Sequence, residues 1–253
     1  MINFGRDVCG DPRIAFEKEW LVTNGIGGYA MGTIGGALTR RYHGLLIAAL
    51  KPPVGRSLLV SKVEETVEYD GKRYPLFCNQ RSDGDYSDAE GCRYLEGVSS
   101  WNNAMGWGYR LADAVLTKNL WMRRDANTAY LDYGVTMRHA PMTLSIDVWV
   151  NHRDHHGDNH KDDLTYELEP ISTGIRVTPS NGSPFYVCSD RAVFTPDPAW
   201  VTGIYRIEED RRGFDPVEDH YRIGAFTVTL NDEPSFFLGF STDANVIADR
   251  KAA

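Results

Sequence analysis

The sequence has no long cluster of basic residues and no long apolar run. Lysine and arginine occur at most in adjacent pairs, and the formal net charge of the 253 residues is −8. Because a phosphate backbone attracts clustered cations, this distribution argues against nucleic acid as a partner. The longest apolar run, residues 45–50, is far too short to cross a bilayer, and residues 1–7 lack the apolar core of a signal peptide. We therefore expect neither a nucleic-acid partner nor a membrane.

Cysteine is also scarce. The four cysteines, Cys9, Cys78, Cys92 and Cys188, are widely separated and form no C-x-x-C pair. This spacing lacks the pairing of a structural zinc site and is not typical of a disulfide-stapled secreted domain. We expect a reduced, cytoplasmic chain that needs no cofactor.

Helical periodicity is nearly absent, whereas strand and turn patterns are abundant. The 24 Gly, 13 Tyr, 10 Phe and 6 Trp favour strands and turns over helices. Residues 142–150 alternate between apolar and polar positions, and Asp70-Gly71 separates the β-rich runs 56–69 and 72–77 as in a hairpin. Similar short runs occur at 129–137, 174–178, 185–188, 200–207, 225–230 and 235–240. The pattern predicts an all-β protein, a large antiparallel β-sandwich with long loops and little helix.

One stretch departs from this pattern. Residues 79–109 are rich in Gly, Asp, Asn, Ser and aromatic residues and show little periodicity, so we expect a long functional loop there. Its acidic run 83–90 has the wrong offsets for an EF-hand, and a solvated loop is the simpler interpretation.

The segment 24–30 contains Gly-x-Gly-x-x-Ala, which is formally a dinucleotide fingerprint. That fingerprint requires a following helix and an acid about 20 residues later. Here Gly32, Gly35 and Gly36 disfavour a helix, and no acid stands at the expected distance. We interpret these glycines as backbone positions that need positive φ or close packing.

Two polar clusters remain. The first, residues 39–46, contains Arg40, Arg41, Tyr42 and His43 before an apolar run. Its side chains are suited to hydrogen-bonding sugar hydroxyls or carboxylates. The alternative is that Arg40 or Arg41 pairs with an acid at a domain surface.

The second cluster, residues 151–160, holds four of the seven histidines and two aspartates. Neutral imidazoles and carboxylates are ligands of Zn, Fe or Mn, so a metal site is one hypothesis. The alternative is a loop whose polar groups hydrogen-bond one another.

Taken together, these segments resemble bacterial and archaeal glycogen debranching enzymes. The resemblance begins with EWLVTNGIGGYA at 19–30 and TRRYHGLL at 39–46, and continues through 52–56 and 61–66. NHRDHH at 151–156 is similar to the family's N-[FY]-R-D-[FY]-H segment, and the acids of 208–219 are similar to its late acidic stretch. The sequence departs from the family at His152 and His155, where aromatic residues are more usual.

The resemblance implies an architecture in which an N-terminal β-supersandwich precedes an (α/α)6-barrel. That barrel holds the general acid and base for α-1,6-glucosidic cleavage. We therefore expect residues 1–253 to be a single supersandwich domain that lacks the catalytic barrel and is inactive by itself. Its expected role is to brace the barrel and to contribute to glycogen or maltooligosaccharide binding.

The residues expected to contact glucan or the barrel are Asn24, Arg41, Tyr42, His43, Trp101, Trp107, Arg153, Asp154 and His156. Aromatic faces stack on sugar rings, although core packing is the alternative for each tryptophan. Two other functions remain open at this point. One is a stand-alone metal-dependent β-sandwich enzyme that uses His152–His160, and the other is a purely structural module that docks on a partner barrel.

Overall fold

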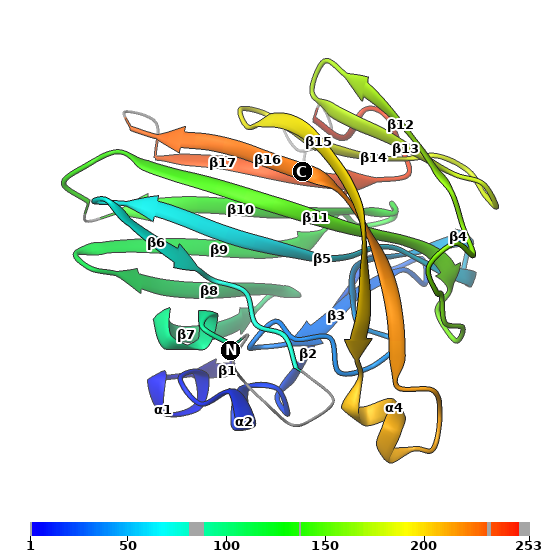
Figure 1. Cartoon of the computed structure of the whole chain (residues 1–253), viewed down its shortest axis with the longest axis horizontal. Helices are drawn as coiled ribbons and strands as arrows, with labels where there is room; N and C mark the ends of the chain where they lie inside the picture. Colours follow the sequence, from blue (N-terminus) through cyan, green and yellow to red (C-terminus); the bar gives the residue numbers. More distant parts are fainter. Residues whose placement is uncertain (1, 81–88, 137, 232–233, 248–253) are drawn as a thin grey trace.

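The computed structural model describes residues 2–80, 89–136, 138–231 and 234–247, which form two large antiparallel sheets (Figure 1). The first sheet contains, in spatial order, β1 (Ile2–Phe4), β7 (Leu95–Trp101), β8 (Ala104–Leu111), β9 (Ala114–Met122), β10 (Thr128–Thr136), β17 (Ser235–Ser241), β14 (Phe185–Ser189), β13 (Gly174–Pro179) and β12 (Tyr166–Ile171). The second contains β15 (Val193–Tyr205), β16 (Val217–Leu230), β11 (Met142–Asp154), β5 (Val54–Tyr69), β4 (Gly44–Lys51), β3 (Tyr29–Thr33) and β2 (Glu19–Thr23), with β6 (Lys72–Pro75) paired to β5. The predicted all-β sandwich is confirmed.

Helix is limited, in the described ranges, to single turns. They are α1 (Arg6–Cys9), α2 (Pro12–Ala15), α3 (Gly91–Tyr94) and α4 (Ile207–Arg211). Pro12 opens α2, and the Asp11 carboxylate accepts a hydrogen bond from the backbone N of Arg13, which is a favourable helix start. None of these described helices has the length and apolar character needed to cross a membrane.

The strand patterns of the sequence appear as expected. Asp70 and Gly71 both have positive φ, 49° and 69°, and form the tight turn between β5 and β6. In β11, Met142, Leu144 and Ile146 are fully buried while the residues between them are partly exposed. The period of two therefore points one face of the strand into the space between the sheets.

The core fills that space with side chains from both sheets. Leu116 and Leu131 from the first sheet, and Val60 and Leu144 from the second, are fully buried members of one apolar cluster. A polar contact also links the sheets, because the Tyr133 hydroxyl donates to Glu65 Oε1 at 2.8 Å. A buried hydroxyl and carboxylate that satisfy each other avoid the cost of an unpaired polar group.

The prediction of one long loop over residues 79–109 is wrong for the described part of that stretch, which contains α3, β7 and β8. Residues 81–88, which include most of the acidic run, lie outside the described residues. In β8 the large buried side chains Met105, Trp107, Tyr109 and Leu111 occupy every second position, but Gly106 and Gly108 stand between them and hide the strand pattern in the sequence. A Cβ at Gly106 would lie 2.7 Å from the ring of Trp101, so a side chain there would displace that ring.

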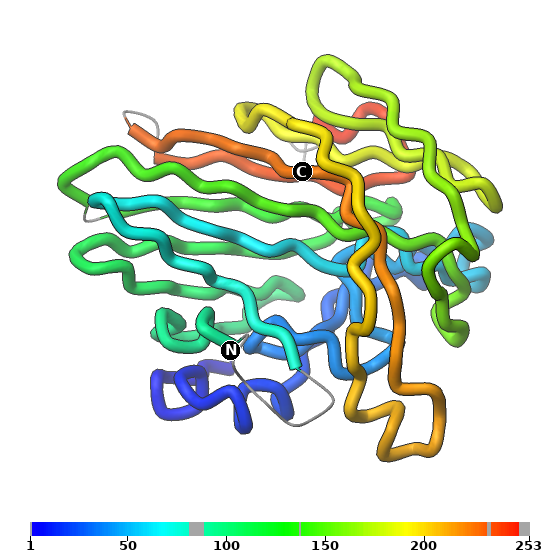
Figure 2. Tube along the Cα trace, viewed as in Figure 1, coloured from blue at the N-terminus to red at the C-terminus, as the bar shows by residue number. Residues whose placement is uncertain are grey.

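The second sheet ends in a set of turns that come together. Figure 2 shows the chain around α4, in yellow to orange, reversing below the ends of β15 and β16. The backbone N of Glu208 donates to the carbonyl of Thr39 at 3.0 Å, which ties this turn to the segment before β4. In the same region, residues 151–153 of β11 are buried on both faces of the strand.

Candidate functional site

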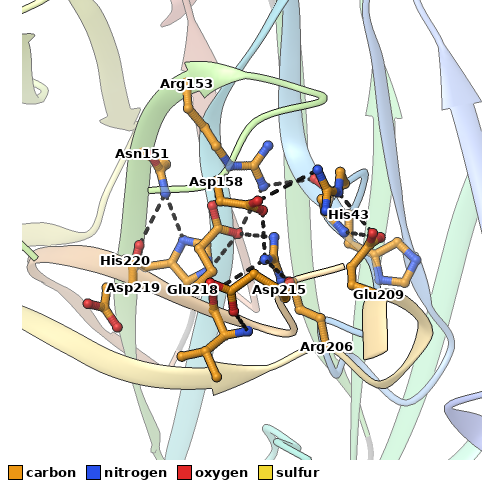
Figure 3. Close-up of polar contacts among 12 residues, drawn as sticks. His43, Asn151, Arg153, Asp158, Arg206, Glu209, Asp215, Glu218, Asp219 and His220 are labelled. Atoms are coloured by element: carbon orange, nitrogen blue, oxygen red, sulfur yellow. Dashed lines mark hydrogen bonds and ion pairs between the residues drawn. The ribbon is translucent and has the colours of Figure 1, made fainter. Parts of the chain in front are cut away.

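A buried network of ion pairs lies at this end of the second sheet (Figure 3). It joins residues 39–43, residues 151–158 and residues 206–218, which are far apart in the sequence. Next to it, through Tyr42 and His155, the surface carries a groove with tyrosine and histidine walls. The network and the groove together form the candidate site.

The centre of the network is the pair between Arg153 and Glu218. The Arg153 guanidinium contacts both carboxylate oxygens, with Nη2 donating to Oε2 at 2.9 Å, and both side chains are almost fully buried. A shift in register between β11 and β5, after Val150, turns Arg153 toward β16. Burial alone raises the pKa of Glu218, but the charge of Arg153 prevails and holds that pKa below its ordinary value.

Arg206 extends this pair. Its side chain is fully buried, and it donates to Glu218 Oε2 at 3.0 Å and to Asp158 Oδ1 at 2.7 Å. The Arg206 guanidinium therefore joins β16 to the turn that follows β11. Such a planar donor holds two carboxylates in fixed directions, which a lysine does not do.

Arg41 forms the second branch. Its Nε donates to Glu209 Oε2 at 2.9 Å, its backbone N donates to Glu209 Oε1 at 3.1 Å, and its Nη1 donates to the His156 carbonyl at 2.5 Å. The guanidinium also lies 4.8 Å from the ring centroid of Phe214. The two branches meet because Arg153 Nη2 donates to the Arg41 carbonyl at 2.8 Å. Arg41 and Arg153 thus pair with acids of the same chain; the sequence raised an ion pair as the alternative for Arg41, but at a domain surface, whereas this pair is buried.

His43 has a tautomer fixed by its surroundings. The backbone N of Thr39 donates to its Nδ1 at 3.1 Å, so the proton lies on Nε2, which donates to Glu19 Oε1 at 3.0 Å. Burial lowers the pKa of His43 and keeps the imidazole neutral. The hydrogen bond from His43 lowers the pKa of Glu19. Glu19 also forms an ion pair with Arg40, with 2.5 Å between Glu19 Oε1 and Arg40 Nε. His43 therefore holds the 39–43 turn in place.

His220 is a second buried imidazole, on β16. It stacks on Trp149 at a centroid distance of 6.2 Å, and its Nδ1 accepts from Asn151 Nδ2 at 3.2 Å. Burial lowers the pKa of His220 to about 4, although Glu218 opposes the shift. This histidine is neutral at physiological pH and packs as an aromatic ring.

The groove adjoins the network at Tyr42 and His155 and has a volume of about 490 Å³. Its walls include Tyr29, Tyr42 and His155, and the Tyr29 hydroxyl lies 3.2 Å from His155 Nδ1. The Tyr42 ring meets His155 and His156 edge-on at centroid distances of 5.6 and 5.5 Å. The groove is lined by Leu21, Thr23, Gly25, Gly27, Gly28, Tyr29, Met31, Tyr42, Arg56 and His155. Partly exposed rings beside hydroxyl, imidazole and guanidinium groups suit a ligand with both apolar faces and hydroxyls.

The glycines of the groove explain the false dinucleotide pattern. Gly25 and Gly27 have φ values of +84° and +101°, and a Cβ on Gly27 would lie 2.3 Å from the carbonyl O of Pro53. A Cβ on Gly28 would lie 2.5 Å from Asn24 Nδ2. The interpretation of these glycines as positions of positive φ or close packing is confirmed.

Asn24 is buried beneath this turn. Its Oδ1 accepts from the backbone N of Ile26 at 3.1 Å, and its Nδ2 donates to the carbonyl of Ala126 at 2.9 Å. It therefore links the groove to the β9–β10 turn of the other sheet. Asp154 is exposed, and its Oδ1 accepts from the backbone N of His156 at 2.8 Å, which shapes the turn without joining the buried network.

The two predicted tryptophans lie in different environments, and neither lines the groove. Trp107 is 6% exposed, donates from Nε1 to the Ile34 carbonyl at 3.0 Å and packs edge-on against Trp20. It is a core residue, which is the alternative raised for it from the sequence. Trp101 is partly exposed at the end of β7, where its ring covers Gly106.

Of the predicted residues, the structure brings together Arg41, Arg153 and His156, which are joined by hydrogen bonds to backbone carbonyls. The Tyr42 hydroxyl also lies 3.1 Å from His156 Nδ1. The histidines of 152–160 are divided among different neighbours. His152 lies against Gly182, while His160 is 3.7 Å from Asp215. Within the residues described, no three His, Cys, Asp or Glu side chains are grouped so as to hold a metal ion.

Sequence reasoning missed several residues of this site. Tyr29, Arg56 and His155 line the groove, and Arg206 joins the two carboxylates of the network. Tyr29, Arg56 and His155 fall inside the segments that carry the family resemblance, which was the available signal. Arg206 had no signal, because its partners are defined only by the folded chain.

A comparison with known protein families matches the part of the chain that contains this site. The family model described as "Glycogen debranching enzyme N terminal" matches residues 18–237. The chain belongs to this family. The match covers the groove, both branches of the network and nearly all of the two sheets.

Other comparisons are more distant. No curated protein matches the sequence. Among solved structures, a bacterial glucoamylase described as complexed with acarbose is similar over 92% of this chain, with 8% identity and a TM-score of 0.41. The matched part is 31% of that glucoamylase chain, so the present chain spans less than a third of its length.

Proposed function

We propose that this chain is the non-catalytic N-terminal domain of a glycogen-debranching amylo-α-1,6-glucosidase. In this proposal residues 1–253 form one β-supersandwich domain that braces a C-terminal (α/α)6-barrel, and the barrel supplies the catalytic carboxylates. The domain works in the cytoplasm and contributes contacts to the α-glucan. Family membership over residues 18–237 supports the assignment to a debranching enzyme.

The observation that carries the glucan part of the proposal is the groove between Tyr29, Tyr42 and His155. A glucose ring offers an apolar face of C–H groups and a rim of hydroxyls. Tyrosine rings pack against the first, whereas phenol, imidazole and guanidinium groups hydrogen-bond the second. Arg56, at the edge of the groove, donates from Nε to the Gly27 carbonyl at 2.6 Å and so also holds the glycine turn.

The buried network supports the bracing part. Three arginines and three carboxylates tie the turns before β4, after β11 and around α4 into one body next to the groove. Such a base holds surface residues in fixed positions for a ligand or a neighbouring domain. On its surface, Phe214 is 49% exposed and lies 5.0 Å from the Arg212 guanidinium. This exposed pair is suited to a protein contact, since aromatic and arginine side chains are enriched at interfaces.

Native electrophoresis in gels with and without glycogen tests the glucan part. We expect the chain to be retarded by glycogen relative to a protein that binds no carbohydrate. If the chain migrates unchanged, the groove does not contact glucan and that part of the proposal fails. The bracing part has its own test, co-elution with a separately expressed helical barrel domain of the family. Separate elution of the two would contradict it.

A further inference from the structure

Two of the four cysteines meet inside the protein. Cys78 follows β6 and Cys92 belongs to α3, and their Sγ atoms are 3.2 Å apart although they are 14 positions apart in the chain. Each residue is 1% exposed. Cys9 and Cys188 are also buried, but neither has a thiol partner among the described residues, and the Cys9 thiol donates to the Phe4 carbonyl at 3.6 Å.

The backbone holds the two thiols together. The backbone N of Gly91 donates to the Phe77 carbonyl at 3.2 Å, so the residues just before both cysteines are hydrogen-bonded to each other. A Cβ on Gly91 would lie 2.2 Å from the Leu76 carbonyl O, which means that this approach requires glycine. On the other side, the backbone N of Leu76 donates to the backbone carbonyl of Glu65, on β5, at 2.9 Å. The thiol contact is therefore fixed by the strands around it.

The two thiols differ in acidity. The hydrogen bond from the Cys92 thiol lowers the pKa of Cys78, and the Lys62 ammonium acts in the same direction. The same hydrogen bond raises the pKa of Cys92. Lys62 Nζ is held 2.8 Å from the Cys78 carbonyl, so the cation stays beside this pair. Cys78 is therefore the more acidic thiol of the pair, and thiolate is the reactive form.

A small oxidant has a space near Phe77, the residue before Cys78. A cavity of about 50 Å³ is lined by Lys62, Leu76 and Phe77, together with Trp20 and Trp107 from the core. A water molecule needs roughly 10–15 Å³ of such volume. Hydrogen peroxide is only slightly larger than water, so it fits this cavity, which reaches Phe77, the residue before Cys78.

We propose that Cys78 and Cys92 form an oxidisable dithiol that closes to a disulfide when the protein meets hydrogen peroxide. The Cys78 thiolate attacks one peroxide oxygen, the O–O bond breaks, and Cys78 becomes a sulfenic acid with release of hydroxide. The Cys92 sulfur then attacks the Cys78 sulfur, the S–O bond breaks, and the Cys92 proton and the hydroxyl leave as water. In sum, two thiols and one peroxide give one disulfide and two waters. This site is independent of the glucan groove.

The test is peptide mapping of the full chain after treatment with dilute hydrogen peroxide and alkylation in denaturant. Trypsin cleaves after Arg73, Arg81 and Arg93, so Cys78 lies in peptide 74–81 and Cys92 in peptide 82–93. We expect two of the four thiols to be lost and these two peptides to appear joined, with the mass of the pair less two hydrogens. Treatment with a reductant should return both separate peptides.

Variants serve as matched controls. In Cys9→Ser and Cys188→Ser the joined peptide should form as in the original chain, whereas in Cys78→Ser it should be lost. The proposal is overturned if all four thiols remain alkylatable after peroxide treatment. It is equally overturned if Cys78 goes to sulfinic acid without cross-linking, or if the cross-link joins Cys9 or Cys188. The mapping of the original chain decides between these outcomes even where a variant folds poorly.

Discussion

Glu218 is the residue on which the buried network depends, because two arginine side chains point at its carboxylate. Both arginines and the glutamate are buried, so water cannot replace a lost partner. The three charged groups stabilise the fold only when all are present, since an unpaired buried charge carries a large desolvation cost. This explains how turns far apart in the sequence are held in one arrangement next to the groove.

We predict that Glu218→Gln lowers the free energy of unfolding by about 3–5 kcal/mol, the usual cost of breaking a buried ion pair. Glu169→Gln is the matched control, because Glu169 also pairs with an arginine but is 56% exposed. An exposed pair contributes about 1 kcal/mol or less. Urea denaturation of both variants measures the difference. Equal, small effects would show that the network does not stabilise the fold.

The buried His220 predicts a pH dependence. Its pKa is about 4 in the folded chain against an ordinary value of 6.5. Between pH 6.5 and pH 4, His220 is protonated in the unfolded chain but neutral in the folded chain. The contribution of His220 to the free energy of unfolding is therefore fully present above pH 6.5 and is lost as the pH falls toward 4. The shift in the pKa of His220 corresponds to a change of about 3 kcal/mol in the free energy of unfolding.

The measurement is the free energy of unfolding from pH 7 to pH 4 in the original chain and in His220→Gln. Burial lowers the pKa of His43 and His152 as well, so both proteins should lose stability on acidification. The original chain should lose more, by about 3 kcal/mol at most. Parallel curves would mean that His220 is not held neutral by the fold.

At the scale of elements, the turn between β2 and β3 shows why glycine is required. Gly27 has a φ of +101°, and a Cβ there would lie 2.3 Å from the Pro53 carbonyl O. Gly36 has a similar φ of +84°, but nothing lies within 4 Å of the position of its Cβ. The two glycines separate the effect of backbone conformation from the effect of close packing.

We expect Gly36→Ala to cost about 1–2 kcal/mol, the penalty of a left-handed conformation for an L-residue. Gly27→Ala should cost clearly more, because the methyl group must also displace the Pro53 segment. Thermal unfolding of both variants gives the comparison. If the two variants are equally stable, the close approach to Pro53 is not a constraint on this turn.

The strands and turns were largely predictable from the sequence, and the site was predictable only in part. Alternation in β11 and the Asp70-Gly71 turn follow from local chemistry. β8 was missed because Gly106 and Gly108 stand where an alternating strand pattern has polar residues. The partners of Arg41 were not predictable, since Glu209 is 168 positions away and no local pattern joins them.

At the scale of the whole molecule, the two sheets act as one support for the groove. Asn24 lies under the glycine turn and donates to the β9–β10 turn, while Asn127 of that turn donates from Nδ2 to the Ala49 carbonyl on β4 at 2.8 Å. These contacts fix the glycine turn of the groove relative to both sheets. The ion-pair network fixes the segments that carry Tyr42 and His155, which line the groove. The resemblance in the sequence pointed to this region, but only the fold places Tyr29, Tyr42 and His155 around one hollow.

The most direct test of the account is calorimetric titration of maltoheptaose into the chain, Tyr42→Ala and Tyr186→Ala. Tyr186 is also partly exposed, but it lies on β14 of the other sheet. We predict that the original chain and Tyr186→Ala bind with the same affinity. Tyr42→Ala should bind about three- to tenfold more weakly, which corresponds to a stacking contribution of roughly 0.5–1.5 kcal/mol. Absence of binding by the original chain, or equal affinity of Tyr42→Ala, would contradict a glucan contact at this groove.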